Sequence, residues 1–179
     1  MSFLDVVRGA LPVVSLRDRT DADIAFLSGL YASTREEELR QVDWSDEQKH
    51  AFLHDQFTRQ HAHYLQHYPR AEWLILEREA APVGRLYVET TGVEIRLMDV
   101  ALLPAFRGGG IGTALMHALL AHADALGLPV TLHVEPFNPA LRLYTRLGFV
   151  ALEERGLYLF MRRAAPAEDD LSGREQRGA

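Results

Sequence analysis

Arg107-Gly-Gly-Gly-Ile-Gly112 is the stretch of this chain that decides its fold. The apolar run Val100-Ala-Leu-Leu-Pro104 precedes it, and apolar residues with helical spacing follow it. The pattern predicts a strand that passes into a helix through a glycine-rich turn. The first N–H groups of a helix have no intrahelical partner, and glycines let a phosphate approach them, so the turn favours anion binding. The alternative is a glycine-rich turn that binds nothing.

Two nucleotide-binding motifs with similar turns do not fit. A Walker loop needs Gly-Lys followed by Ser or Thr, whereas Gly112 is followed directly by Thr113 and Lys49 is the only lysine of the chain. A dinucleotide fingerprint needs a third glycine where Leu115 stands. The sequence therefore excludes a Walker-type NTPase and does not favour nicotinamide binding.

Composition sets the class of protein. The chain has 179 residues, of which 47% are hydrophobic, which suits one soluble domain with a core. A formal charge of -6 argues against nucleic acid or an anionic membrane as partner, and the absence of cysteine excludes disulfides and a cysteine acyl-enzyme. We expect an N-terminal extension over residues 1–11, a domain over 12–163 and a flexible polar tail over 164–179. Without a signal peptide or a membrane span, a cytoplasmic location is expected.

The first half of the domain reads as one strand and two helices. A strand is predicted over residues 12–17, and a capping box of Thr20 and Asp23 opens a helix that runs to about Tyr31. The charged stretch over 33–44 is predicted to be a loop or a short helix. A second capping box, Ser45 with Gln48, opens a long helix that runs to about residue 67.

The second half begins with a β-meander. Strands are predicted over 72–77, 83–89 and 93–103, with turns at residues 81–82 and 91–92. A helix from residue 110 to 126 and a buried strand over 130–134 follow. Asn138 is predicted to be the N-cap and Pro139 to stand at the first helical position of a short helix whose body is residues 140–147. Two strands are predicted after it, near 149–153 and 157–162.

Two motifs resemble the GNAT family of N-acetyltransferases. Arg107-Gly-Gly-Gly-Ile-Gly112 matches the family's acetyl-CoA motif, Arg/Gln-x-x-Gly-x-Gly/Ala. Asn138-Pro-Ala-Leu-Arg-Leu-Tyr-Thr-Arg-Leu-Gly-Phe149 resembles the family's last helix and the start of the next strand. The resemblance covers about residues 94–149. It implies an α/β (α+β) fold: a mixed, mostly antiparallel sheet of six to seven strands, splayed in the middle and flanked by about four helices.

The resemblance also implies acetyl-CoA as the acyl donor. Its pantetheine arm would pair with the backbone of the fourth strand around Met98, Val100 and Leu102. Its diphosphate would lie on the amides of the turn, namely Gly108, Gly109, Gly110, Ile111, Gly112 and Thr113. Arg107 adds a charge or braces the turn, and Asn138 caps the helix and touches the amide arm.

The reaction implied is acetyl transfer to a primary amine by direct attack in a ternary complex. It needs an uncharged nucleophile, an oxyanion donor and an acid for the thiolate. Tyr144 is the candidate acid, although it could instead only pack its helix, and a backbone N–H near Met98 is the candidate oxyanion donor. The resemblance to the family's protein-lysine members makes Glu94 the first candidate for the base. The second candidate is Asp99, which interrupts an apolar run and must be paired, hydrated or functional, and the third is a water chain or another residue.

The acceptor is less defined. Trp44, Gln60, Tyr64 and the run from Glu36 to Glu38 are candidates to contact a small-molecule amine or a peptide, or else they are packing and solvated residues. His50 with His54 and His63 with His67 have metal-ligand spacing, but no metal is expected because H-E-x-x-H and thiolates are absent. A homodimer stays open. The alternative function is a non-catalytic acyl-CoA-binding sensor or interaction module.

Overall fold

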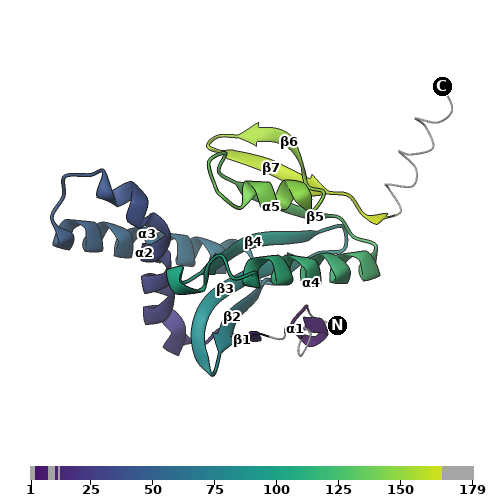
Figure 1. Ribbon diagram of the computed structural model, residues 1–179, viewed down its shortest axis with the longest axis horizontal. Coiled ribbons are helices and arrows are strands. Elements are labelled where there is room, and N and C mark those ends of the chain that lie inside the picture. Colours follow the sequence, from purple (N-terminus) through teal and green to yellow (C-terminus); the bar gives the residue numbers. More distant parts are fainter. Residues whose placement is uncertain (1–2, 8–10, 12, 167–179) are drawn as a thin grey trace.

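One seven-stranded sheet with helices on both faces makes up the chain over residues 3–7, 11 and 13–166, which the computed structural model describes (Figure 1). Its elements are α1 (Phe3–Val7), β1 (Ser15–Asp18), η1 (Asp21–Asp23), α2 (Ile24–Arg40), α3 (Asp46–His67), β2 (Glu72–Arg78), β3 (Ala81–Thr90), β4 (Ile95–Leu102), η2 (Pro104–Phe106), α4 (Ile111–Leu126), β5 (Val130–Val134), α5 (Leu141–Arg146), β6 (Val150–Arg155) and β7 (Tyr158–Arg163). Within these ranges no helix is both long and apolar enough to cross a bilayer.

The sheet parts in its middle. Its strand order is β1-β2-β3-β4-β5-β7-β6, and β4 with β5 is the parallel pair among antiparallel neighbours. This pair is in register from Ile95 opposite Val130 to Leu97 opposite Leu132, while β4 continues to Leu102. The two strands therefore separate beyond Leu97. The predicted α/β fold with a splayed, mostly antiparallel sheet is confirmed.

Alternate residues of the central strands face two different layers. Leu74, Leu86 and Val88 pack in one buried cluster with Leu115 and Leu119 of α4. Their neighbours Ile75 and Tyr87 face the other way and pack with Leu27, Tyr31 and Phe57 of α2 and α3. Helices α1, α4 and α5 thus cover one face of the sheet, and α2 and α3 cover the other face near its parting.

The first residues of the chain contribute to the core. The N–H groups of Phe3 and Leu4 donate to the carboxylate of Glu72 on β2, at 2.9 and 3.1 Å, and Phe3, Leu4 and Val7 are buried. The described residues of the predicted N-terminal extension therefore pack against the domain. Residues 1–2, 8–10 and 12, and residues 167–179 of the predicted tail, lie outside the described residues, and the division of the chain at residues 12 and 163 stays a prediction.

The helix predicted to end near Tyr31 runs to Arg40 as α2, so that predicted end is wrong. Of the two predictions for residues 33–44, a loop or a short helix, the helical one holds up to Arg40, as a continuation of α2. Two ion pairs at i, i+3 spacing support the added turns: Arg35 with Glu38 and Glu37 with Arg40, each at 2.9 Å. Leu39 is buried on the opposite side. Much of the charged run is therefore helical, with Glu36, Glu37 and Arg40 exposed. The Ser45–Gln48 capping box and the end of α3 at His67 are as predicted.

The turn between β2 and β3 also differs from the prediction. Residues 81–82 belong to β3, and the turn is made by Glu79 and Ala80, whose φ angles are 53° and 62°. Non-glycine residues in this left-handed region give little sequence signal for a turn. Further along β3, a Cβ on Gly84 would lie 2.5 Å from the Ala101 carbonyl oxygen, so glycine allows β3 and β4 to approach at that point.

The predicted cap of α5 is wrong by a few residues. The helix begins at Leu141, after Asn138 Oδ1 accepts a hydrogen bond from the Ala140 N–H at 2.9 Å. Asn138 thus forms a local turn ahead of the helix, and Pro139 lies in that turn rather than at the first helical position. The prediction failed because the same sequence, an asparagine followed by Pro-x-Leu, fits both a helix cap and a local turn.

Candidate functional site

The glycine turn presents open backbone at the start of α4. Gly108 and Gly110 have φ angles of 76° and 86°, and Gly110 is the N-cap residue of α4. A Cβ placed on Gly108, Gly109, Gly110 or Gly112 would meet no described heavy atom within 4 Å. The Ala114 N–H donates to the Gly110 carbonyl at 2.9 Å and so begins the helical ladder. The amides before Ala114 thus precede the helical ladder, and the first N–H groups of a helix have no intrahelical partner, which is what an anion site requires.

Arg107 connects this turn to two other elements. Its Nε donates to the Leu102 carbonyl at the end of β4, at 2.9 Å. One terminal nitrogen lies 3.1 Å from the hydroxyl of Ser33 on α2. These contacts favour the bracing role among the two that the sequence left open. They fix the turn relative to the strand that leads into it.

Strand β4 carries a β-bulge at Met98. Tyr87 of β3 is opposite Asp99, and the next residue, Val88, is opposite Leu97, so Met98 is the extra residue between them. A bulge turns the backbone out of the regular ladder and re-aims the residues beside it. Here it lies one residue beyond the last paired position with β5, at the point where the sheet opens.

A narrow cavity of about 100 Å³ occupies this opening. Its lining comes from β4, β5, the segment after β5 and α5: Leu97, Met98, Asp99, Val100, Leu132, His133, Val134, Asn138 and Tyr144. Most of the Tyr144 side chain is buried, and this burial, with a further contribution from the Asp99 charge, raises the pKa of Tyr144 to about 12. The structure thus brings together Met98, Val100, Asp99, Asn138 and Tyr144.

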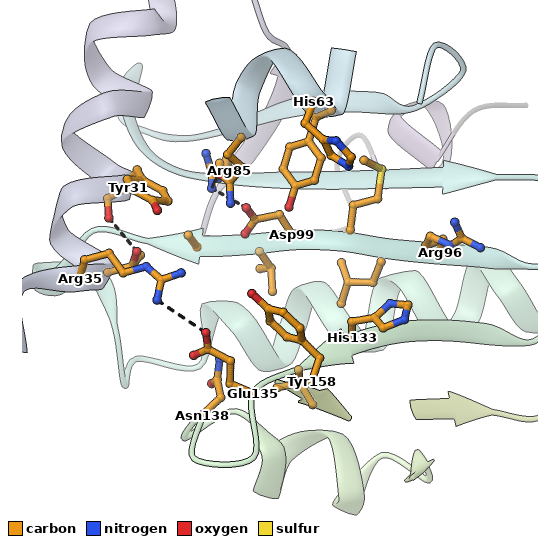
Figure 2. A pocket seen from close by; sticks show the side chains of 18 of the residues that line it. Tyr31, Arg35, His63, Arg85, Arg96, Asp99, His133, Glu135, Asn138 and Tyr158 are labelled. Carbon is orange, nitrogen blue, oxygen red and sulfur yellow. Dashed lines mark hydrogen bonds and ion pairs between the residues drawn. The ribbon is translucent and has the colours of Figure 1, made fainter. Parts of the chain in front are cut away.

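A larger cavity of about 540 Å³ shares the β4 wall and extends toward α2 and α3. Figure 2 shows side chains that reach it from several elements. Tyr31 and Arg35 come from α2, His63 from α3, Arg85 from β3, and Asp99 and Arg96 from β4. His133 comes from β5, Glu135 and Asn138 from the segment after it, and Tyr158 from β7. Both halves of the parted sheet therefore contribute to one site.

Asp99 forms an ion pair with Arg85 on the floor of this cavity. Arg85 is only 3% exposed, and the same terminal nitrogen that meets Asp99 also donates to Gln60 Oε1 of α3 at 3.1 Å. Burial alone would lower the pKa of the Arg85 guanidinium, but the charge of Asp99, with smaller contributions from Tyr87, Tyr64 and the hydrogen bond to Asp99, more than offsets it, so the pKa is raised. Arg85 therefore stays charged.

A second group of charges lies near the outer part of the cavity. Arg35 donates to Glu38 at 2.9 Å and lies 3.6 Å from Glu135, which belongs to the other half of the sheet. Its guanidinium carbon lies 5.8 Å from the centre of the Tyr31 ring. Arg35 thus connects α2 with the segment after β5 across the opening, as the dashed line between Arg35 and Glu135 in Figure 2 shows.

Glu94, the base candidate that the sequence analysis put first, lies elsewhere. It precedes β4, where its carboxylate accepts from Thr131 Oγ1 at 3.0 Å and from Arg96 at 2.7 Å. It is not part of the described lining of either cavity. Glu94 connects β4 to β5 below the opening, whereas Asp99 faces the cavity.

Of the residues predicted to contact the acceptor, some line the larger cavity and others do not. Gln60, Tyr64 and Glu38 line the larger cavity. Trp44 packs against Phe52, with ring centres 5.3 Å apart, away from that lining. Sequence reasoning missed Arg85, Arg35, Glu135 and Tyr158. Of these, Arg85 gave a usable signal, because it interrupts the otherwise uncharged run from Val83 to Val88 as Asp99 interrupts the apolar run from Leu97 to Leu103.

The comparisons with known proteins agree with this architecture. The model of the "Acetyltransferase (GNAT) family" matches residues 33–149 of the chain. That range includes the glycine turn, both cavity walls on β4 and β5, and Tyr144.

Two curated relatives are similar over part of their length. A mycothiol acetyltransferase of Actinosynnema mirum is 52% identical over 75 residues, which is 41% of this chain and 22% of that protein. Another, of Streptosporangium roseum, is 39% identical over 79 residues, or 43% of this chain and 20% of that protein. The matched segments thus span about a fifth of the relatives' length.

Solved structures resemble most of the chain in fold. The PaiA N-acetyltransferase of Thermoplasma acidophilum, solved in complex with coenzyme A, superimposes with a TM-score of 0.65 at 15% identity. The match covers 84% of this chain and 98% of that one. At this identity the likeness concerns the fold alone.

Proposed function

Since this chain belongs to the acetyltransferase (GNAT) family, we propose that it is an acetyl-CoA-dependent N-acetyltransferase that acts on a primary amine by direct attack in a ternary complex. The observation that carries the proposal is the opening between β4 and β5. It joins the bulge at Met98, a buried tyrosine and a carboxylate in one cavity, and an open helix N-terminus follows the same strand.

The donor would occupy the parted sheet. The edge of β4 beyond Leu97 is not paired with β5 in the described structure, so the backbone of Met98, Val100 and Leu102 can pair with the amides of a pantetheine arm. The amides of Gly108 to Thr113 would receive the diphosphate at the N-terminus of α4, where the helix dipole favours negative charge. Asn138 lines the opening and offers an amide side chain to the same arm.

Tyr144 would act as the acid. Its phenol carries its proton at neutral pH, as an ordinary tyrosine does, and burial raises its pKa further, to about 12; it lines the narrow cavity beside Met98. When the acceptor nitrogen bonds to the thioester carbonyl carbon and the C–S bond breaks, Tyr144 donates a proton to the departing thiolate. The backbone N–H at the Met98 bulge would stabilise the intermediate oxyanion.

Asp99 would take the proton that the amine loses, directly or through water. It lines both cavities, whereas Glu94 is occupied by Thr131 and Arg96 below the opening. We therefore assign the base role to Asp99 and a structural role to Glu94. The two curated relatives are named mycothiol acetyltransferases, which supports a small molecule as the acceptor.

A thiol-release assay with acetyl-CoA and a panel of amines tests the proposal. The chain has no cysteine, so every thiol that a disulfide reagent detects comes from coenzyme A. We expect amine-dependent thiol release with an equal amount of acetylated amine found by mass spectrometry. Binding of acetyl-CoA without turnover on any amine would favour a non-catalytic acyl-CoA-binding module instead.

A further inference from the structure

Arg85 is a buried cation that the sheet places beside the proposed base. In the β3–β4 register Arg85 is opposite Ala101 and Tyr87 is opposite Asp99, so Arg85 and Asp99 are diagonal neighbours. Diagonal neighbours on one face of an antiparallel pair lie within reach of long side chains. The ion pair is thus built into the register of two strands, not into a loop.

The surroundings leave the pair as the dominant charge at this end of the cavity. The guanidinium carbon of Arg85 lies 5.1 Å from the centre of the Tyr87 ring, and Gln60 contributes a neutral amide oxygen. Tyr64 also lines this wall; its phenol is uncharged at neutral pH, as an ordinary tyrosine is, and burial raises its pKa further. One buried positive charge therefore offsets one negative charge.

Because the Arg85–Asp99 pair has no net charge, this part of the cavity binds the ammonium form and the uncharged form of an amine with different affinity. An ammonium that leaves water for this site loses hydration, and the carboxylate that would compensate it is already paired with Arg85. An uncharged amine loses much less hydration and is the form that can attack a thioester. A bare carboxylate at the same place would instead hold the ammonium, which cannot react.

We propose that Arg85 is a positioning and specificity-determining residue, which neutralises Asp99 so that the acceptor enters the site as an uncharged amine. The class of acceptor that follows is a weakly basic amine, of which a large fraction is uncharged at neutral pH. This inference rests on the proposed function and adds to it the form of the amine that the site selects.

Two amines of similar shape and different basicity test it. Ethylamine is almost entirely ammonium at neutral pH, whereas 2,2,2-trifluoroethylamine is largely uncharged. In Arg85→Gln, Asp99 loses its partner and holds ethylammonium unproductively. We expect KM and kcat for ethylamine to fall together, with KM lower by about tenfold or more, the scale of one charge pair in a partly buried site. The KM for trifluoroethylamine should not fall.

Three variants serve as controls. Arg85→Lys keeps the charge and should keep the wild-type KM pattern. Arg85→Gln combined with Asp99→Asn has neither charge and should lose the drop in the ethylamine KM, since the effect needs the unpaired carboxylate. Asp99→Asn alone leaves Arg85 unpaired, so the KM for ethylamine should rise more than that for trifluoroethylamine, which provides the test if Arg85→Gln does not fold.

The results separate the two proposals. The role of Arg85 would be overturned, while the enzyme assignment stands, if the KM values of both amines changed equally in Arg85→Gln and in Asp99→Asn. It would also be overturned if Arg85→Lys showed the same drop in the ethylamine KM as Arg85→Gln. Turnover of neither amine by the wild-type chain, with acetyl-CoA bound, would count against the proposed function itself.

Discussion

Tyr144 of α5 and Asp99 of β4 face the same narrow cavity from opposite halves of the parted sheet. Burial raises the pKa of Tyr144 to about 12, and the negative charge of Asp99 acts in the same direction. A phenol that retains its proton thus lies beside a carboxylate that is paired with Arg85. These two side chains, on the two sides of one opening, are the acid and the base of the proposed mechanism.

Tyr144→Phe should lower kcat by about 10²- to 10⁴-fold, the usual contribution of a general acid. The phenyl ring keeps the packing against Phe149, whose ring centre lies 5.8 Å away, so the affinity for acetyl-CoA should change little. Thiol-release kinetics and calorimetry measure the two quantities. An unchanged kcat would leave Tyr144 with a packing role only.

Asp99→Asn and Glu94→Gln should have different effects. Asp99→Asn removes the proposed base and should lower kcat by about 10²-fold or more. Glu94→Gln weakens the contact with Thr131 that joins the start of β4 to β5 and the ion pair with Arg96 of β4, so it should lower the unfolding temperature with a smaller loss of kcat. Parallel measurements of turnover and thermal unfolding distinguish them. A larger loss of kcat in Glu94→Gln would return the base role to Glu94.

Gly84→Ala should destabilise the fold by about 1–3 kcal/mol, the common range for an overpacked buried site. The added Cβ would lie 2.5 Å from the Ala101 carbonyl oxygen, and that strand must shift to accept it. Gly92→Ala is the matched control, because its Cβ would meet no described atom within 4 Å. Urea unfolding of both variants measures the difference, and equal stabilities would show that β3 and β4 adapt without cost.

The ion pair of Asp23 with Arg17 predicts a pH dependence of stability. The hydrogen bond from Arg17 lowers the pKa of Asp23 from 3.8 to about 2. A lowered carboxyl pKa stabilises the fold above the unfolded value and loses that effect as the pH falls through the folded value. Asp23→Asn should therefore cost about 2 kcal/mol near pH 7 and much less near pH 2.

Asp21→Asn provides the comparison for this pair. The Asp21 side chain is fully exposed, and its contact with Arg19 is 3.5 Å long. Because exposed pairs contribute little, its stability should follow the wild type at both pH values. Urea unfolding at pH 7 and pH 2 gives both comparisons. An Asp23→Asn effect of equal size at the two pH values would mean that the ion pair is not its cause.

Most of the fold was predictable because local signals and long-range packing agree. The glycine turn, the Ser45–Gln48 capping box and the apolar run of β5 are each decided by a few neighbouring residues, and the structure has all three where the sequence puts them. The turn at Glu79 and Ala80 was missed because tertiary pairing of β2 with β3 imposes a conformation that neither residue favours alone.

Only those site residues were predictable whose positions depend on the order of the strands and not on their exact register. Met98, Asn138 and Tyr144 come together because strand order and the parting of the sheet determine their positions. The partner of Asp99 was not found, because diagonal pairing of Arg85 depends on the register of two strands and on the bulge at Met98. Tyr158 reaches the cavity from β7, far along the chain, and no local pattern reports such a contact.

Calorimetric titration of coenzyme A into the wild-type chain, Gly110→Val and Gly156→Val tests the central claim most directly. Both glycines have positive φ angles, 86° and 64°, so both changes strain the backbone, but only Gly110 begins α4. We predict binding to the wild type and to Gly156→Val, with affinity lost or strongly reduced in Gly110→Val. No binding to the wild type, or equal affinity in a folded Gly110→Val, would contradict the proposal that this turn holds the diphosphate.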